Sequence, residues 1–306
     1  MINRLKTVAW ITFWMAWLGA ALAPALLAQG GGIRAHSPAN DNKQYDKRDL
    51  SGIWTRNGSP AGFGGGGTCA DCGDRGYGNE VPPLTPLGQK MFDANKPSYG
   101  RLLGSTDANA HPEEHIGRRR AVPPSNGSDP YQTCNPEGVT RALIYPDPVE
   151  FNVLPGKILQ QFEWTYAART IWTDGRKLID DPDQWRWWGY STGHWDGDTF
   201  VVNSNGFDER TWVDHFGYPH STDMKLEERY RRTAYDTMEL TMTITDPKVY
   251  TRPWVSQLKR FRKLDTQNGI KTVDGWTGLL EDLCAPADDV EYFIKRVRDP
   301  AGGVIH

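Results

Sequence analysis

Apolar and polar residues alternate with a period of two in the second half of the chain, which predicts a β-hairpin. In residues 238–245 the apolar positions are Met238, Leu240, Met242 and Ile244. This pattern is typical of a strand with one buried and one solvated face. In the preceding run, the more apolar face consists of Met224, Leu226, Glu228, Tyr230 and Arg232. That face is expected to point inward and to carry Glu228 with it.

A second hairpin is predicted upstream, where Asp196-Gly197 separates residues 187–195 from residues 199–205. Asp-Gly between two β-rich runs favours a type I′ turn, which needs positive φ at both central residues. Further strand-like runs, joined by short turn-rich segments without a crossover helix, occupy residues 151–154, 157–165, 169–173 and 255–264. The predicted fold is therefore all-β, an antiparallel meander of roughly eight strands that closes into a barrel or folds as a sandwich.

The same pattern divides the chain into three parts. Residues 1–28 form a separate leader, and residues 29–148 are rich in Gly, Pro, Asn and Asp. Few short helices are expected in this second part, the most convincing at residues 86–95, and residues 51–55 are a possible short strand. We interpret it as a long arm that wraps the β-body of residues 149–306, which includes a C-terminal extension.

The leader has the features of a secretory signal peptide. Arg4 and Lys6 make its start positive, residues 8–27 are largely apolar, and the small residue Ala28 precedes a candidate cleavage point. The apolar run is also about as long as a membrane span requires, so an uncleaved anchor is the alternative. Both interpretations place the body outside the cytoplasm, in the periplasm or secreted.

Composition narrows the possible functions by exclusion. The chain has 306 residues and a net charge of −3, with no Lys/Arg stripe, so nucleic acid is not an expected partner. Its 13 tryptophans indicate a core or pocket lined with rings. We find no Walker or helix-opening GxGxxG motif and no tight metal-ligand spacing, so no cofactor and no metal ion are expected.

Four cysteines in an exported chain indicate disulfide formation. Cys69 and Cys72 are close enough in sequence for a small-loop disulfide. Cys134 and Cys284 are then expected to join the arm to the C-terminal segment. The predicted pairs are therefore Cys69–Cys72 and Cys134–Cys284.

Several blocks of the sequence resemble a family of exported bacterial β-rich proteins. The most specific match covers residues 188–254, around a block of the type WxGxSxGxWxGDTxVV, and the other matches are residues 49–54, 83–97, 129–141 and 162–176. The resemblance implies an exported body with a lipocalin-like barrel. It implies no particular activity.

Glu228 is the first candidate for chemistry. A carboxylate on the inward face of a strand must be paired, hydrogen-bonded or protonated, because burying it alone is costly. A raised pKa would suit Glu228 to general acid or base catalysis. The alternative is a purely structural ion pair with a buried arginine such as Arg169.

The polar loop at residues 208–223 supplies the other catalytic candidates. An aspartate commonly orients a histidine for proton transfer, and we predict the pair Asp214 and His220 because the adjacent Asp214 and His215 are expected to point apart. Since His220 precedes the strand that carries Glu228, the three candidates Glu228, His220 and Asp214 are expected at the barrel mouth. A polar rim loop with surface histidines is the alternative.

Rings around the first hairpin are candidates for contact with a ligand. The predicted substrate-binding residues are Arg169, Trp188, Tyr190, His194 and Trp212. Arg169 is expected either to hold an anionic group of the substrate or to neutralise Glu228. Core packing is the alternative role of the rings.

These residues support hypotheses from two classes of function. The first is an exported, cofactor-independent enzyme of the lyase, isomerase or hydratase type, which acts by acid–base chemistry on a small, partly apolar molecule. The second is a non-catalytic periplasmic binding protein for such a molecule, while a structural envelope protein would need a large exposed apolar face. The expected partner is a small molecule, with membrane contact only if the leader stays uncleaved. A histidine and a carboxylate in hydrogen-bond reach inside the cavity would favour the enzyme.

Overall fold

The computed structural model describes residues 42–56, 62–63, 82–97, 127–264, 278–280 and 283–284. All of them belong to one compact unit, Ala35–His306. The predicted signal segment and the predicted Cys69–Cys72 disulfide lie outside the described residues. Within the described residues, no helix has the length and apolar character that crossing a bilayer requires.

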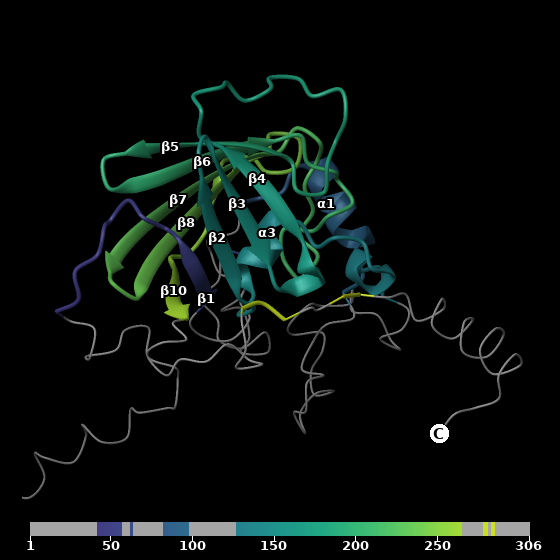
Figure 1. The fold of residues 1–306 in the computed structure, drawn as a ribbon. Helices are drawn as coiled ribbons and strands as arrows, with labels where there is room; N and C mark the ends of the chain where they lie inside the picture. Colours follow the sequence, from purple (N-terminus) through teal and green to yellow (C-terminus); the bar gives the residue numbers. More distant parts are fainter. Residues whose placement is uncertain are drawn as a thin grey trace, which may run out of the picture. The chain divides into compact units, whose positions relative to one another are not determined.

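The described strands form one sheet that closes on itself as a barrel (Figure 1). The order around the barrel is β10-β1-β2-β3-β4-β5-β6-β7-β8, and β8 pairs with β10 to close it, while the short β9 adds to β8. The predicted all-β barrel is confirmed. The bounds are β1 Gly52–Arg56, β2 Val149–Leu154, β3 Lys157–Phe162, β4 Ala168–Trp172, β5 Tyr190–Asp196, β6 Thr199–Asn205, β7 Lys225–Ala234, β8 Thr237–Thr245, β9 Trp254–Val255 and β10 Lys259–Leu264.

The helices among the described residues are short and lie in the connections. They are α1 (Pro86–Ala94), the 3-10 helix η5 (Pro130–Thr133), α3 (Val139–Ile144) and the 3-10 helix η6 (Trp164–Tyr166). The Thr85 hydroxyl caps α1 by accepting the Gly88 N–H at 3.0 Å. The backbone N–H of Thr85 donates to the carbonyl of Val249 at 2.9 Å. This bond fastens the start of α1 to the segment after β8.

β1 is a wall of the barrel, although its residues were expected in the wrapping arm. It lies between β2 and β10 and pairs with both in antiparallel register. Trp54 on β1 is fully buried, and its indole N–H donates to the carbonyl of Leu50 at 2.9 Å. The barrel is therefore not confined to the predicted β-body of residues 149–306, because it closes through a strand from the first part of the chain.

The barrel interior follows the predicted alternation of apolar and polar positions. On β8 the fully buried residues are Met238, Leu240, Met242 and Ile244. On β7 the buried residues are Leu226, Glu228, Tyr230 and Arg232. The opposite walls contribute apolar side chains such as Phe151, Ile158, Phe162 and Ile171. Glu228 thus points into a core filled mainly by apolar side chains.

The hairpin of β5 and β6 forms at the predicted Asp-Gly, with a shifted turn. Asp196 pairs with Thr199, so the two loop residues are Gly197 and Asp198. Only Gly197, at φ 58°, has positive φ. Positive φ at the first central residue alone is typical of a type II′ turn, and the expected type I′ turn does not form.

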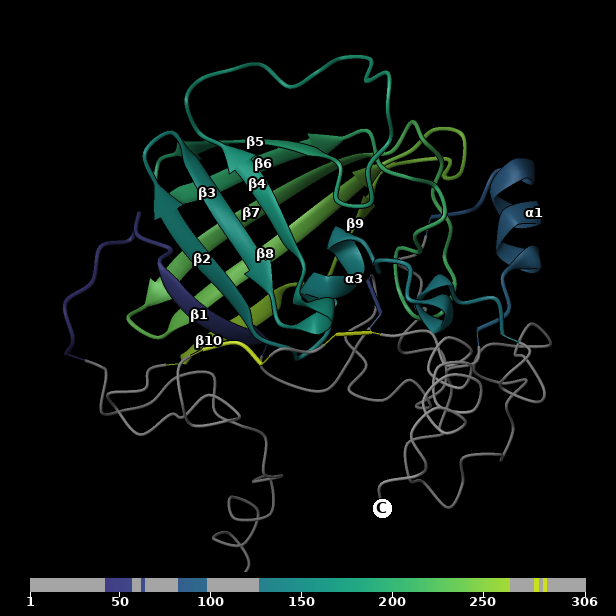
Figure 2. The same ribbon diagram turned by 45° about the vertical axis from the view of Figure 1, so that its right-hand side comes forward.

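The chain departs from an antiparallel meander between β4 and β5. These strands are parallel, and their ladder consists of two pairs, Ile171–Ser191 and Trp172–Thr192. Parallel neighbours require a connection that returns along the strand. Residues 173–189 make this crossover as a long loop without a helix (Figure 2).

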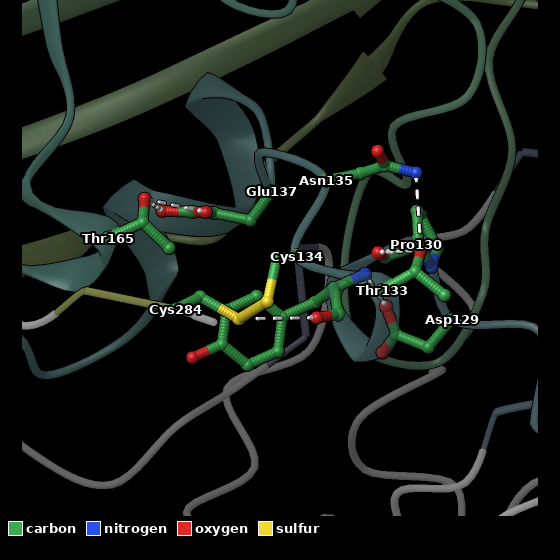
Figure 3. Close-up of a disulfide and its surroundings, with 9 residues drawn as sticks. Asp129, Pro130, Thr133, Cys134, Asn135, Glu137, Thr165 and Cys284 are labelled. Carbon is green, nitrogen blue, oxygen red and sulfur yellow. Dashed lines mark hydrogen bonds between the residues drawn. A yellow bond between two sulfur atoms is a disulfide. The ribbon is translucent and has the colours of Figure 1, made fainter. Parts of the chain in front are cut away.

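A disulfide joins Cys134, directly after η5, to Cys284 (Figure 3), which confirms the predicted pair. The backbone N–H of Leu280 also donates to the carboxylate of Glu163 at 2.8 Å. These two contacts attach the described C-terminal residues to the segment between η5 and α3 and to the turn that follows β3.

The position of β1 in the barrel wall predicts the effect of removing its large side chain. Trp54→Ala should lower the free energy of unfolding by roughly 3–5 kcal/mol, because it leaves a cavity in a filled core. Trp185→Ala, at a residue that is 56% exposed, should change it by less than about 0.5 kcal/mol. Chemical denaturation of both variants measures the difference. Equal small effects would mean that β1 is a detachable part of the arm.

Candidate functional site

A pocket of about 730 Å³ lies between β4, the crossover loop at residues 173–189, and β5. Its volume falls in the range of pockets that hold small organic molecules. It is lined by residues from both strands and from the loop between them. The parallel β4–β5 pairing therefore creates the site, because the returning loop forms one of its walls.

The pocket lies against the outer face of the barrel wall. Arg169 and Ile171 point inward from β4 and are buried, so the alternating residues Ala168, Thr170 and Trp172 point outward. These outward residues line the pocket. This pocket therefore lies beside the wall, whereas the predicted site is at the barrel mouth.

Two contacts fix the crossover loop over the pocket. The carbonyl of Ile179 accepts a hydrogen bond from the side-chain amide of Asn205, at the end of β6. The backbone N–H of Arg186 donates to the carbonyl of Gly206 at 2.9 Å, and the carbonyl of Arg186 accepts the backbone N–H of Asp208 at 3.0 Å. Because the loop is held at both points, the pocket exists before any ligand arrives.

Aromatic side chains supply much of the pocket's lining, which includes Trp172, Trp185, Trp187, Trp188 and Tyr190. Trp188 stacks on the core residue Phe162, with ring centroids 4.8 Å apart. Gly189, at φ 62°, turns the chain between two of these rings. Trp185 and Ile179 are 56% and 46% exposed, although both are large and apolar. Exposed apolar side chains around a pocket are typical of a binding site.

Cationic side chains stack on these rings. The guanidinium of Arg176 lies 3.6 Å from the Trp172 ring centroid, and that of Arg186 lies 4.3 Å from the Tyr190 ring centroid. Such stacking holds a flexible guanidinium in place. The N–H edge of Arg176 is bound by Asp174, whereas Arg186 has no carboxylate partner among the described residues. Of the described lining residues, four are cationic (Arg169, Arg176, Lys177 and Arg186) and none is acidic.

Glu228 and Arg169 form a buried ion pair inside the barrel. The two guanidinium nitrogens of Arg169 donate to the two carboxylate oxygens of Glu228 at 2.9 and 2.5 Å. Tyr230 donates its hydroxyl to Glu228 at 2.6 Å, and Arg169 Nε donates to Gln160 at 2.6 Å. Burial alone would lower the pKa of Arg169, but the charge and hydrogen bonds of Glu228 raise it. Between the two predicted roles of Arg169, the geometry matches neutralisation of Glu228.

His220 and Asp214 are both buried but do not form the predicted pair. His220 Nδ1 lies 3.0 Å from the carbonyl of Ser221, and Nε2 lies 2.5 Å from the hydroxyl of Thr211. A carbonyl only accepts, so Nδ1 carries the proton, while the Thr211 hydroxyl lies within reach of both Nε2 and the carbonyl of Asp208, the latter at 3.1 Å. Burial lowers the pKa of His220, so its ring is neutral. This arrangement is a local structural one, in which Thr211 and Ser221 take the place expected for Asp214.

Asp214 instead fixes backbone around it. Its carboxylate accepts the N–H of Phe63 at 3.3 Å and that of Phe216 at 3.0 Å. Burial raises its pKa to about 6, against the opposing effect of these bonds. Lys259 Nζ donates to the carbonyl of Gly62 at 3.0 Å. Asp214 and Lys259 together hold the short arm segment 62–63 against the barrel.

The remaining predicted binding residues divide between the pocket and other places. Trp188 and Tyr190 line the pocket, as does Arg169. His194 is exposed on β5 and is not among the described lining residues. Trp212 is buried, with the guanidinium of Arg141 6.0 Å from its ring centroid, and lines a second pocket of about 510 Å³.

Sequence reasoning missed the contribution of the crossover loop. Lys177, Arg186 and Trp172 line the pocket but were not among the candidates. Their signal was present in the alternation of aromatic and basic residues from Trp172 to Trp188. Because the sequence predicts a turn-rich connection between neighbouring antiparallel strands here, the pattern alone does not reveal a pocket wall.

Glu137 is a buried carboxylate beside the disulfide, and it was not predicted. Figure 3 shows it pointing toward Thr165, whose hydroxyl donates to it at 3.2 Å. Thr165 has φ 57°, which is strained for a β-branched residue. Burial raises the pKa of Glu137 to about 7, against the opposing charge of Arg141. No described pocket reaches Glu137, so we assign it a structural role.

Comparison with protein-family profiles, curated proteins and solved structures finds no match for this chain. Among the described residues, no group of three or more His, Cys, Asp or Glu side chains is placed to hold a metal ion. The site is therefore interpreted from its own geometry.

The buried ion pair predicts that Glu228 contributes to stability. Glu228→Gln should lower the free energy of unfolding by roughly 3–5 kcal/mol, because it leaves the charge of Arg169 without its partner in the interior. Glu227→Gln is the matched control, since Glu227 is on the opposite face of β7 with its side chain 43% exposed. Its effect should stay below about 0.5 kcal/mol. Urea denaturation measures the free energy of unfolding of both variants. A stable, fully folded Glu228→Gln protein would contradict a structural role.

The raised pKa of Glu137 predicts a pH dependence of stability. The pKa is about 7 in the folded protein and 4.5 in the reference state, so the stabilising contribution is complete below pH 4.5 and is lost as pH rises through 7. The free energy of unfolding should fall by roughly 3 kcal/mol across this interval through this group.

Glu137→Gln removes the titrating group and should flatten that part of the profile. Urea denaturation at several pH values, for both proteins, measures the difference. Asp214 titrates in the same direction, with a folded pKa of about 6, and is common to both proteins. The difference between the two profiles therefore reports Glu137 alone. Parallel profiles from pH 4.5 to 7 would show that the pKa of Glu137 is not raised.

Proposed function

We propose that this protein binds a small, partly apolar molecule in the pocket between β4, the crossover loop and β5, without catalysing a reaction on it. The observation that carries the proposal is the preformed, ring-lined pocket of about 730 Å³. Exposed Trp185 and Ile179 at its wall add support, because a ligand would cover apolar surface that water now contacts.

The candidate acid–base groups give less support to an enzyme. Both oxygens of Glu228 are held by Arg169, and both ring nitrogens of His220 have local partners. A general base needs a free lone pair within reach of the substrate proton. None of the described pocket-lining residues is a histidine, an aspartate or a glutamate. The lining is suited to holding a molecule in place.

We also propose that the protein acts outside the cytoplasm. The Cys134–Cys284 disulfide supports this location, because disulfides persist in oxidising compartments. The predicted signal segment at residues 1–28 is the second support. A periplasmic or secreted protein that binds small molecules would meet compounds that come from outside the cell.

A blocking substitution tests the proposed pocket. Thr170→Trp places a large ring on the outward face of β4, inside the pocket, and should abolish binding of molecules that stabilise the unchanged protein in a thermal-shift screen. Thr241→Trp is the matched control on β8, whose residues do not line this pocket. It should keep the binding.

Circular dichroism first confirms that each variant is folded, and Ala168→Trp, at an exposed position in the same pocket, replaces Thr170→Trp if that variant misfolds. Molecules from the screen that bind equally well to all variants must bind outside this pocket, and that result would refute the proposed site. A screen without hits would remove the support for a binding function.

A further inference from the structure

The charged side chains among the described pocket-lining residues are all cationic, although the protein has a net charge of −3. The described lining residues include four cations and no acid. The acidic residues of the crossover loop, which are Asp174, Asp180, Asp181 and Asp183, are exposed and do not line the pocket. Three of the four cations, which are Arg176, Lys177 and Arg186, come from the crossover loop, while Arg169 points into the barrel.

Two of the four cations are already paired with carboxylates. Arg169 is bound by Glu228 inside the barrel. Arg176 is bound by Asp174, at 2.6 Å, in a pair that remains partly exposed. Arg186 and Lys177 have no carboxylate partner among the described residues. They are the charges that remain for a ligand.

Arg186 is positioned to use its charge. Its backbone is fixed on both sides by the bonds to Gly206 and Asp208, and its guanidinium face lies over Tyr190. The carboxylate of Asp208 is occupied by Arg210, at 2.6 and 2.9 Å. A guanidinium that is stacked on one face keeps its edge N–H groups for an anion with two or more oxygens, such as a carboxylate or sulfonate.

We propose that the ligand is an organic anion with an aromatic or apolar body, whose acidic group is bound by Arg186 and Lys177. Its body lies against the rings of the pocket, among them Trp172 and Trp185. This inference rests on the proposed binding function and specifies the chemical class that the pocket selects. Charge and stacking act together, since the body of the ligand, once it lies against the rings, displaces water beside the ionic contact and strengthens it.

A pair of fluorescent probes tests the selectivity. Anilinonaphthalene sulfonate carries a sulfonate, and N-phenylnaphthylamine is the same ring system without it. The full protein should bind the sulfonate saturably, with one site, and about 10–100-fold more tightly than the neutral probe. Added salt should weaken binding of the sulfonate and leave binding of the neutral probe nearly unchanged. Thr170→Trp should abolish both signals.

Arg186→Gln isolates the charge from the rings. It should lower the affinity for the sulfonate by about 10-fold or more and leave the affinity for the neutral probe unchanged. Arg231→Gln is the control, because Arg231 is an exposed arginine on β7 and does not line the pocket. It should change neither affinity. Thermal unfolding of both variants verifies that the fold is kept.

The outcomes separate this inference from the function on which it rests. If both probes bind equally and Arg186→Gln has no effect, the pocket binds molecules without selecting anions, and only the inference is overturned. If neither probe binds saturably, or if Thr170→Trp leaves both signals intact, the pocket is not the site and both proposals are overturned.

Discussion

The ion pair of Arg169 and Glu228 is the constraint on which the barrel interior depends. Each partner comes from a different wall, β4 or β7, and neither is exposed to water by more than 2% of its side chain. Two charges in such a core are tolerated only when they neutralise each other and satisfy their remaining hydrogen-bonding groups. Gln160 and Tyr230 provide those bonds. The network fixes which face of β4 points inward, and therefore which side chains remain outside.

The outward face of β4 becomes useful because β5 runs parallel to it. An antiparallel hairpin would have joined the two strands with a few residues, and the wall would have stayed open to solvent. The crossover loop instead covers that wall and carries Lys177, Trp185 and Arg186 to it. One unusual strand pairing thus joins an apolar surface from the barrel to charges from a loop.

Sequence periodicity was sufficient for the parts of the fold that depend on neighbours in the chain. The inward position of Glu228 follows from alternation within one strand, and the β7–β8 hairpin follows from two such strands. Arg169 was named as a partner of Glu228 in one of two alternatives, but the choice between an ion pair and a catalytic Glu228 required the relative placement of β4 and β7, which are separated in the barrel and are not fixed by local pattern. His220 shows the same limit, because its partners Thr211 and Ser221 offered ordinary polar groups with no distinctive spacing. The pocket was missed because it depends on one parallel pairing.

Closure of the barrel has a consequence for how the chain reaches its native state. Arg56 on β1 pairs with Phe261 on β10, so the last seam joins the beginning of the described chain to a point near its end. Contacts between such distant segments form slowly, because the entropy of a large loop is lost before the contact stabilises anything. Until β10 arrives, the edges of β1 and β8 have unpaired backbone groups that can recruit strands from other molecules. Slow pairing of this seam would therefore leave the chain open to such contacts for longer.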